Sequence, residues 1–258
     1  MIGRAIGFGF ITARDFVARC LLRVHVTPNM LTLLGMVITG GAGVCFALGS
    51  GSRFYSKEPH NGYLYLAAWL IILSSACDML DGAVARIGNC GSKFGAFLDS
   101  TLDRYSDFAV FAGIAIHYVM VQPANITFAL MSMLAFFNSF MISYAKARAE
   151  DIIEHCNVGY WQRGERSAAL LIAAFAGNIP ALVVQQAILP MLTALSRVFY
   201  TKAVIEGKAP ITDPRKGGLW LKMQLWKWPR MSIPYDIVTG INIAWLIFAP
   251  VPSFDLFR

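Results

Sequence analysis

Four aspartates at regular spacing are the residues of this sequence that could do chemistry together. Asp78 and Asp81 are three residues apart, and Asp99 and Asp103 are four residues apart. On a helix, either spacing places both side chains on one face. Carboxylates held close together in a low dielectric keep their charges only if a cation neutralises them. Because an all-oxygen ligand set suits Mg²⁺, Mn²⁺ or Ca²⁺ rather than Zn²⁺, we predict a divalent metal site built by all four.

The four acids also fall at matched depths on either side of a turn. Residues 88–91 read Gly-Asn-Cys-Gly, which predicts a break between two helices. At about 1.5 Å per residue, Asp81 and Asp99 lie roughly 13 and 14 Å from the centre of the turn, and Asp78 and Asp103 roughly 17 and 20 Å. An antiparallel pair of helices would bring the acids into two layers. The alternative, that they cap helices or pair with nearby basic residues, explains one acid better than all four.

Small and basic residues accompany the acids. Gly82 and Gly95 would let a flat or phosphorylated ligand approach the backbone. Close packing between helices explains either glycine equally well. Arg86 can donate several hydrogen bonds to a phosphate. The surroundings of the acids are therefore compatible with a phosphorylated ligand.

The elements that must position these residues are predicted membrane helices. Of 258 residues, 57% are hydrophobic and 14% are charged, and the mean hydropathy is +0.56, whereas a soluble domain carries about 25% charged residues. A membrane span needs about 20 mostly apolar residues. Asp, Glu, Lys and Arg are absent from residues 30–52, 59–77, 108–145, 167–196 and 237–254.

Turns at 122–125 and 177–180 divide the two longest of these runs. The fold class that we predict is an all-α integral membrane protein with six transmembrane helices. An amphipathic helix over residues 1–23 would lie on the membrane surface, because charged residues interrupt its apolar positions. Residues 24–203 would form the membrane domain, and residues 204–258 a C-terminal extension with a basic loop and a candidate seventh hydrophobic helix.

The net charge of +7 is unevenly placed along the chain. Basic residues gather in residues 1–23 and 197–230, and the short turns at 122–125 and 177–180 carry none. By the positive-inside rule, the N-terminus, the 86–93 turn, the 146–166 loop and the 197–230 loop face the cytoplasm, with 50–61 as a mild exception. We therefore expect a multi-pass protein of the cell membrane that contacts anionic lipids, and no nucleic-acid partner. Five scattered cysteines predict free thiols.

One extended pattern resembles the signature of a known family. It reads Asp78-x-x-Asp81-Gly82-x-x-Ala85-Arg86, eight residues, Gly95-x-x-x-Asp99-x-x-x-Asp103, and it resembles the CDP-alcohol phosphotransferases. The segment Thr27-Pro28-Asn29-x-Leu31-Thr32 also looks like the start of that family's first span. The resemblance covers residues 24–203. It implies a six-helix membrane enzyme, dimeric, that moves a phosphatidyl-type group from a CDP-linked lipid such as CDP-diacylglycerol onto an alcohol and releases CMP.

The resemblance also implies roles for individual residues. Two Mg²⁺ or Mn²⁺ ions would be held by Asp78, Asp81, Asp99 and Asp103, in a site opening to the cytoplasm, and Asp103 would be the general base. Transfer of this type needs charge neutralisation, in-line placement and a group that takes the hydroxyl proton, so an acidic cluster agrees with it. The CDP group would be bound by Asn29, Thr32, Asp81, Gly82, Ala85, Arg86 and Gly95.

Two further segments, residues 143–150 and 159–166, concern the acceptor alcohol. They resemble the branch of the family that makes phosphatidylinositol phosphate or its archaeal ether-lipid counterpart, although Gln162 stands where Glu is expected. The matching residues that would bind the phosphate of inositol phosphate are Lys146, Arg148, Arg163 and Arg166. The positive-inside rule alone would also place basic residues here. Glycerol 3-phosphate, the acceptor of a phosphatidylglycerophosphate synthase, is the main rival.

Two other classes of protein could carry acids in a membrane. A cation transporter would need a polar path across the bilayer, whereas the acids lie near one side and the outer halves of the predicted spans hold few polar residues. A catalytically inactive homologue acting as an assembly partner would not need the intact signature. Both alternatives are therefore weaker than the enzyme.

Overall fold

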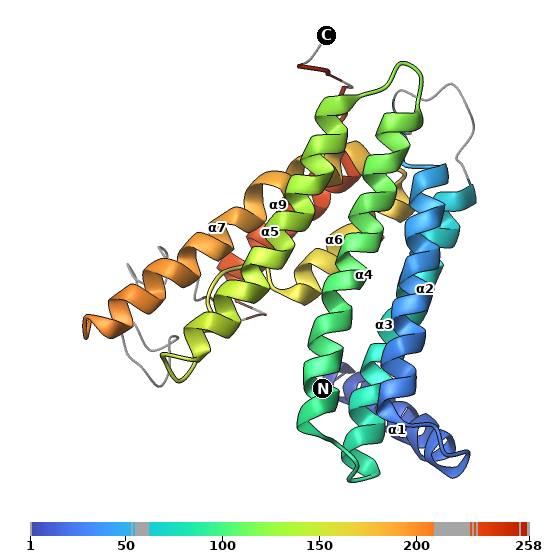
Figure 1. The fold of residues 1–258 in the computed structure, drawn as a ribbon, viewed down its shortest axis with the longest axis vertical. Helices are drawn as coiled ribbons and strands as arrows, with labels where there is room; N and C mark the ends of the chain where they lie inside the picture. The colour runs from blue at the N-terminus through green and yellow to red at the C-terminus, as the bar shows by residue number, and fades with distance from the viewer. Residues whose placement is uncertain are drawn as a thin grey trace.

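The structure, a computed structural model, describes residues 2–52, 54, 62–208, 228, 230, 232–252 and 254–256. Within these residues the regular elements are helices, as the all-α prediction requires (Figure 1). The helices are α1 (Ile2–Arg23), α2 (Pro28–Leu48), α3 (Gly62–Ile87), α4 (Lys93–Met120), α5 (Ile126–Glu150), α6 (Arg163–Ala176), α7 (Ile179–Ile205) and α9 (Ile233–Phe248).

Four of these helices, α2, α3, α5 and α7, are long and apolar enough to cross a membrane. The remaining members of the bundle are shorter or more polar. α4 has 28 residues but carries the charged signature residues in its first half. α6 has 14 residues, so at about 1.5 Å per residue it is shorter than a hydrocarbon core of about 30 Å. A count of six or seven spans therefore stays a prediction.

Side-chain caps set where the helices begin. The Thr27 hydroxyl accepts a hydrogen bond from the Met30 backbone N–H at 3.4 Å, and the Ser92 hydroxyl accepts one from Gly95 at 2.9 Å. Each cap satisfies a backbone donor that the first turn of a helix leaves unpaired. The start of a helix expected at Thr27 is confirmed, and so is the break predicted at 88–91, after which Ser92 caps α4.

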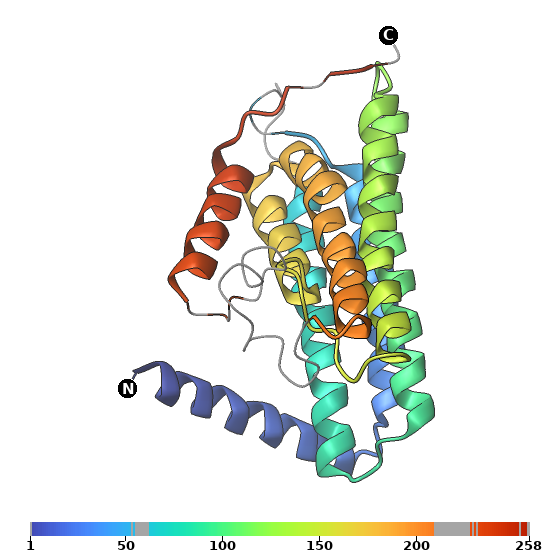
Figure 2. The same ribbon diagram turned by 90° about the vertical axis from the view of Figure 1, so that its left-hand side faces the viewer.

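The helices from α2 to α7 alternate in direction along one bundle (Figures 1 and 2). α1 leaves this bundle sideways at the end where α3 turns into α4 (Figure 2). Ala18 of α1 is buried there in one cluster with Leu31, Ala83 and Val84. The helix predicted for residues 1–23 is thus present and packs beside α3, while its position on a membrane surface stays a prediction.

α2 lies between the two helices that carry the acids. It packs against both α3 and α4, and these two pack mainly through it rather than against each other. Two glycines allow the close approach of α2 to α4. A Cβ atom at Gly43 would overlap the carbonyl oxygen of Ala109, and one at Gly113 would overlap the carbonyl oxygen of Gly43. Small residues at such a crossing let two backbones meet directly.

The predicted loop over 197–230 begins too early and is corrected by the structure. α7 continues to Ile205, and Arg197 is 2% exposed within it. Arg197 can be buried because it donates hydrogen bonds to the carbonyl oxygens of Ile142 and Val158. Most of the basic loop, over residues 209–227, lies outside the described residues.

The C-terminal extension returns along the bundle as α9 and packs against α6 and α7. The Asn178 side chain, in the turn before α7, donates hydrogen bonds of 3.0 Å to the carbonyl oxygens of Leu246 and Ala249. The indole N–H of Trp245 donates to the carbonyl oxygen of Ala181 at 2.9 Å. These bonds attach the end of α9 to the start of α7.

Candidate active site

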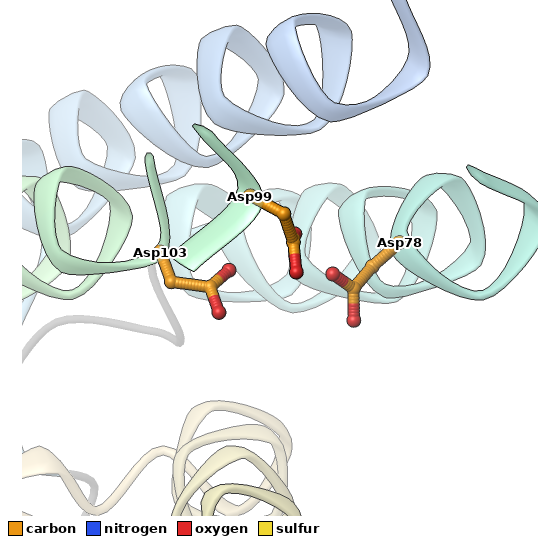
Figure 3. Close-up of side chains that lie close together, drawn as sticks. All are labelled: Asp78, Asp99 and Asp103. Atoms are coloured by element: carbon orange, nitrogen blue, oxygen red, sulfur yellow. The ribbon is translucent and has the colours of Figure 1, made fainter. Parts of the chain in front are cut away.

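Three of the four signature aspartates meet at one point between α3 and α4. One carboxylate oxygen from each of Asp78, Asp99 and Asp103 lies within 4.8 Å of the other two. Figure 3 shows Asp99 between the other two, with the side chains of Asp78 and Asp103 extending from either side toward it. The Asp78 side chain is 41% exposed, and that of Asp103 is 17% exposed. The group is therefore reachable from outside the bundle.

These three acids fit a hard divalent cation. Asp99 Oδ1 is buried and has no hydrogen-bond partner among the described residues. A buried carboxylate oxygen without a donor is costly unless a cation approaches it. Carboxylate oxygens are the ligands that Mg²⁺ and Mn²⁺ accept.

Asp81 lies apart from this group of three. It is buried, and the Thr32 hydroxyl of α2 donates a hydrogen bond to its carboxylate at 2.9 Å. Three residues along a helix correspond to about 300° of rotation, so Asp81 is turned by about 60° from Asp78. Asp78, Asp99 and Asp103 thus form a triad, and the carboxylate of Asp81 is turned toward α2. The expected arrangement of the four acids in two matched layers stays a prediction.

The residues expected to bind CDP gather around Asp81 where α2, α3 and α4 approach one another. A Cβ atom at Gly95 would lie 3.1 Å from Asn29 Oδ1, and one at Gly82 would lie 3.4 Å from Arg86 Nη1. Thr32 reaches the same place through its bond to Asp81. Ala85 lies one turn beyond Asp81 on α3 and is half-buried. Asn29 and Thr32 of α2 thus lie beside signature residues of both neighbouring helices.

Arg163, the first residue of α6, reaches the acidic triad. Its Nη1 lies 2.5 Å from Asp103 Oδ2 and 3.4 Å from Asp78 Oδ1. Arg104 Nη1 lies 3.8 Å from the same oxygen of Asp103. The negative charge of the triad is thus offset in part by two guanidinium groups of the chain itself.

Two cavities meet at Asp103 and Arg163. The first, of about 350 Å³, runs inward from Asp78 between the helices. The second, of about 370 Å³, lies between the end of α5 and the start of α6. Lys146 and Arg197 are among the residues that line it. Asp103, Asp107, Arg163 and Arg166 line both. An anionic group in the second cavity would therefore lie next to the acidic triad.

Comparison with known protein families identifies the family of this chain. A family model described as CDP-alcohol phosphatidyltransferase matches residues 25–205, which is more than half of the chain. The chain is a CDP-alcohol phosphatidyltransferase by family. The predicted resemblance is confirmed, and the chain is placed among transferases of phospholipid biosynthesis.

Similar proteins carry the names of the branch that the sequence indicated. Phosphatidylinositol phosphate synthase of Cutibacterium acnes is 33% identical over 167 residues, which cover 64% of this chain and 73% of that protein. Archaetidylinositol phosphate synthase of Pyrococcus horikoshii is 33% identical over 191 residues, which cover 74% of this chain and 91% of that protein.

Crystal structures of phosphatidylinositol phosphate synthase from Mycobacterium tuberculosis share the fold at 30% identity. The complex with manganese and citrate has a TM-score of 0.61 and covers 73% of this chain and 88% of that one. The form with CDP-DAG bound has a TM-score of 0.60 and covers 73% of this chain and 92% of that one.

The four basic residues expected at the acceptor are not all together in this CDP-alcohol phosphatidyltransferase. Lys146, Arg163 and Arg166 line the second cavity. Arg148 is 63% exposed and donates a hydrogen bond of 2.7 Å to Asp151. Residues two apart on a helix do not share a face, so Lys146 and Arg148 cannot both point into one cavity.

Arg197 is a residue of the second cavity that sequence reasoning missed. Its Nη2 donates to Gln162 Oε1 at 2.8 Å, and the Gln162 amide donates to the carbonyl oxygens of Val158 and Gly159 at 3.1 and 2.8 Å. A glutamate at position 162 could not donate these two hydrogen bonds. The glutamine found where Glu was expected therefore adds two bonds to the loop before α6. The only local signal for Arg197 was its position directly after the long charge-free run 167–196.

Proposed function

We propose that this chain transfers a phosphatidyl-type group from a CDP-linked lipid to a phosphorylated polyol, with inositol phosphate as the acceptor, and releases CMP. The second cavity, lined by Lys146, Arg163, Arg166 and Arg197, is called the basic cavity from here on. The observation that carries the proposal is that Asp103 of the acidic triad also lines this basic cavity, where Arg163 contacts it. Family membership supports the donor, because the family is defined by CDP-linked alcohols. The basic cavity supports an acceptor that carries its own phosphate.

The donor would lie along the start of α2 and the signature faces of α3 and α4. Its CDP group would contact Asn29, Thr32, Asp81, Gly82, Ala85, Arg86 and Gly95. The absence of a side chain at Gly82 and Gly95 leaves room for a ligand against the backbone. Arg86, which is exposed at the end of α3, is available to a phosphate oxygen.

Asp78, Asp99 and Asp103, with Asp81 as the fourth carboxylate, are the residues that would hold Mg²⁺ or Mn²⁺, and we propose two ions. Bound there, a divalent ion would offset the negative charge of the phosphate being transferred. The relative from M. tuberculosis was crystallised with manganese, which supports the choice of metal.

Asp103 is the proposed general base. It lies where the two cavities join, so a hydroxyl group of an acceptor held in the basic cavity would come within reach of its carboxylate. A base must be placed within hydrogen-bond distance of the proton that it removes. Arg163 holds the Asp103 carboxylate in this position through its bond of 2.5 Å.

The acceptor phosphate would be held by Lys146, Arg163 and Arg166, with Arg197 behind them. Several charge-assisted bonds to one phosphate are stronger than neutral ones and fix its orientation. Arg148, which faces Asp151 instead, is left out of this proposed set. Glycerol 3-phosphate offers the same phosphate to the same cavity, and it is the competing acceptor.

We propose that α2 to α7 are the six membrane spans, with α6 as the shortest, and that α9 is the candidate seventh. The alternating directions of these helices support it (Figure 2). α1 and the end of α5, which carry basic residues, lie toward the same end of the bundle (Figure 1). The positive-inside rule assigns that end to the cytoplasm. A homodimer is proposed on the family resemblance, and light scattering of the detergent-solubilised protein tests it.

One assay tests the proposed function. Purified protein is given CDP-diacylglycerol and a panel of alcohols, namely inositol phosphate, glycerol 3-phosphate, inositol and serine, with and without Mg²⁺, and CMP is measured. We expect CMP release that requires the metal and is fastest with inositol phosphate. Fastest turnover with glycerol 3-phosphate would change the acceptor, and a preference for free inositol or serine would refute an acceptor phosphate site. No release with any alcohol would favour a transporter or an inactive homologue.

A further inference from the structure

Glu165 lies between the two arginines of α6 that enter the basic cavity, but it faces the other way. Its Oε1 accepts hydrogen bonds from Arg230 Nε at 3.0 Å and from the Tyr235 hydroxyl at 2.7 Å, and Arg230 Nη2 lies 2.8 Å from the same oxygen. The Glu165 side chain is 8% exposed. A buried carboxylate is costly unless donors reach it. Oε1 has these three donors, whereas Oε2 is buried without a hydrogen-bond partner among the described residues, so the bonds to Arg230 and Tyr235 are what hold this carboxylate.

The contact acts on the turn that places the arginines. Arg163, Glu165 and Arg166 all belong to the first turn of α6. Arg230 also lies close to the backbone of this turn, because a Cβ atom at Gly164 would lie 3.3 Å from its Nη2. Arg163 directly precedes Gly164, and Arg166 directly follows Glu165. A displacement of this turn would therefore move both arginine side chains.

Tyr235, one of the two partners of Glu165, belongs to a helix that is itself attached to the bundle. Arg230 and Tyr235 precede and begin α9, beyond the residues 25–205 that the family model matches. The Thr239 hydroxyl lies 3.0 Å from the Tyr160 hydroxyl, and Gln185 Nε2 donates to Asn242 Oδ1 at 2.9 Å. With the bonds of Asn178 at the other end, α9 is attached to the bundle along its whole length.

The extension also closes off one side of α6. A cavity of about 280 Å³ lies between α6 and α9, with Glu165, Arg230 and Tyr235 at its polar end and Ile172 and Leu246 among its apolar lining. On its other face, the first turn of α6 borders the basic cavity. The turn is thus held between the extension and the site.

We propose that the C-terminal extension positions the acceptor-binding arginines, with Glu165 as the positioning residue and with Arg230 and Tyr235 as the clamp that holds it. This inference rests on the proposed function, because it takes Arg163 and Arg166 to be ligands of the acceptor. It adds a part of the site that lies outside the matched family domain. A clamp of this kind affects the binding of the acceptor and leaves the binding of the CDP-linked donor unchanged, since the donor residues lie on α2, α3 and α4.

The experiment compares full-length variants of the clamp. In Tyr235→Phe with Arg230→Ala, we expect the Michaelis constant for inositol phosphate to rise about tenfold, the effect of losing a charge-assisted contact. The Michaelis constant for CDP-diacylglycerol is expected to stay unchanged. Arg230→Lys, which keeps the charge, should recover part of the loss. Asp236→Asn, an exposed substitution one residue from Tyr235, is the matched control and should match the wild type.

Several results would overturn the clamp. They are an equal rise in both Michaelis constants, an unchanged constant for the acceptor, or a loss explained wholly by unfolding. Unfolding is checked by the thermal stabilisation that CDP-diacylglycerol gives each variant. If the wild type prefers an unphosphorylated alcohol, the proposed acceptor is wrong, and the variants are compared with that alcohol as the substrate. An unchanged Michaelis constant for that alcohol would refute the clamp independently of the proposed acceptor.

Discussion

Arg163 Nη1 lies 2.5 Å from Asp103 Oδ2, although the two residues are 60 positions apart in the chain. The same nitrogen lies 3.4 Å from Asp78 Oδ1, so one guanidinium from α6 contacts acids of both α3 and α4. Arg163 also lines the cavity proposed for the acceptor phosphate. The acids proposed to bind metal and the cavity proposed to bind phosphate are therefore both in contact with the Arg163 side chain.

The first prediction follows from this shared side chain. Arg163→Ala should tighten Mn²⁺ binding about fivefold, since the half-exposed ion pair that competes with the metal is worth on the order of 1 kcal/mol. The same variant should raise the Michaelis constant for the acceptor. Mn²⁺ titration followed by electron paramagnetic resonance measures the first effect, with Arg148→Ala as the control. Weaker Mn²⁺ binding in the Arg163 variant would show that this arginine supports the metal site instead of competing with it.

The second prediction separates the base from the other carboxylates. Asp103→Asn should lower turnover by at least about 100-fold, the usual contribution of a general base, and leave binding of the CDP-linked lipid nearly unchanged. Asp81→Asn should weaken the binding of metal and nucleotide as well, since Asp81 is bonded to Thr32 beside the proposed CDP site. Donor binding is measured by thermal shift with CDP-diacylglycerol. Equal losses of binding in both variants would make Asp103 chiefly a ligand.

Removal of the metal gives the third prediction. A chelator should abolish CMP release, and added Mg²⁺ or Mn²⁺ should restore it. At about 100 times its dissociation constant, Mn²⁺ should stabilise the folded wild type by about 2.7 kcal/mol. This gain should be lost in Asp99→Asn, because Asp99 Oδ1 is a buried oxygen without a hydrogen-bond partner in the described structure. Full activity in the presence of chelator would contradict the metal site.

The positions of the helices could be predicted from local signals. Thr27 caps the helix that it was expected to start, α4 begins directly after the predicted break at 88–91, and charge-free runs mark the longest apolar helices. Local periodicity could not assign Arg197 to a helix interior. Its burial depends on carbonyl oxygens of Ile142 and Val158, which are contributed by other segments.

The members of the acidic site could be predicted, but their exact partners could not. The spacing of the aspartates identifies shared faces, whereas the hydrogen bond from Thr32 to Asp81 joins residues 49 apart. The same limit applies to Glu165, whose partners Arg230 and Tyr235 are 65 and 70 residues away. Contacts of this kind depend on how helices pack, and a single sequence carries no local signal for them.

The fourth prediction concerns the crossing of α2 and α4. Gly43→Ala should destabilise the fold by about 1–3 kcal/mol, the usual effect of overpacking, because the new methyl group would meet the backbone of Ala109. Gly40→Ala on the same helix is the matched control, since a Cβ atom there has no heavy atom within 4 Å, and it should be neutral or slightly stabilising. Thermal unfolding in detergent measures both. Equal effects would mean that the glycines do not mark a close contact.

The fifth prediction tests which basic residues bind the acceptor. Lys146 lines the basic cavity, whereas Arg148 faces Asp151 on the other side of α5. Lys146→Ala and Arg166→Ala should each raise the Michaelis constant for inositol phosphate about tenfold or more, because each removes a charged donor to a phosphate. Arg148→Ala removes an exposed ion pair, so it should change that constant less than twofold by the usual weakness of such pairs. All three variants remove one positive charge at the same end of the bundle, so a long-range effect of charge would appear equally in each. A rise in the Arg148 variant as large as in the other two would therefore assign the effect to the charge of the whole loop, and not to the cavity.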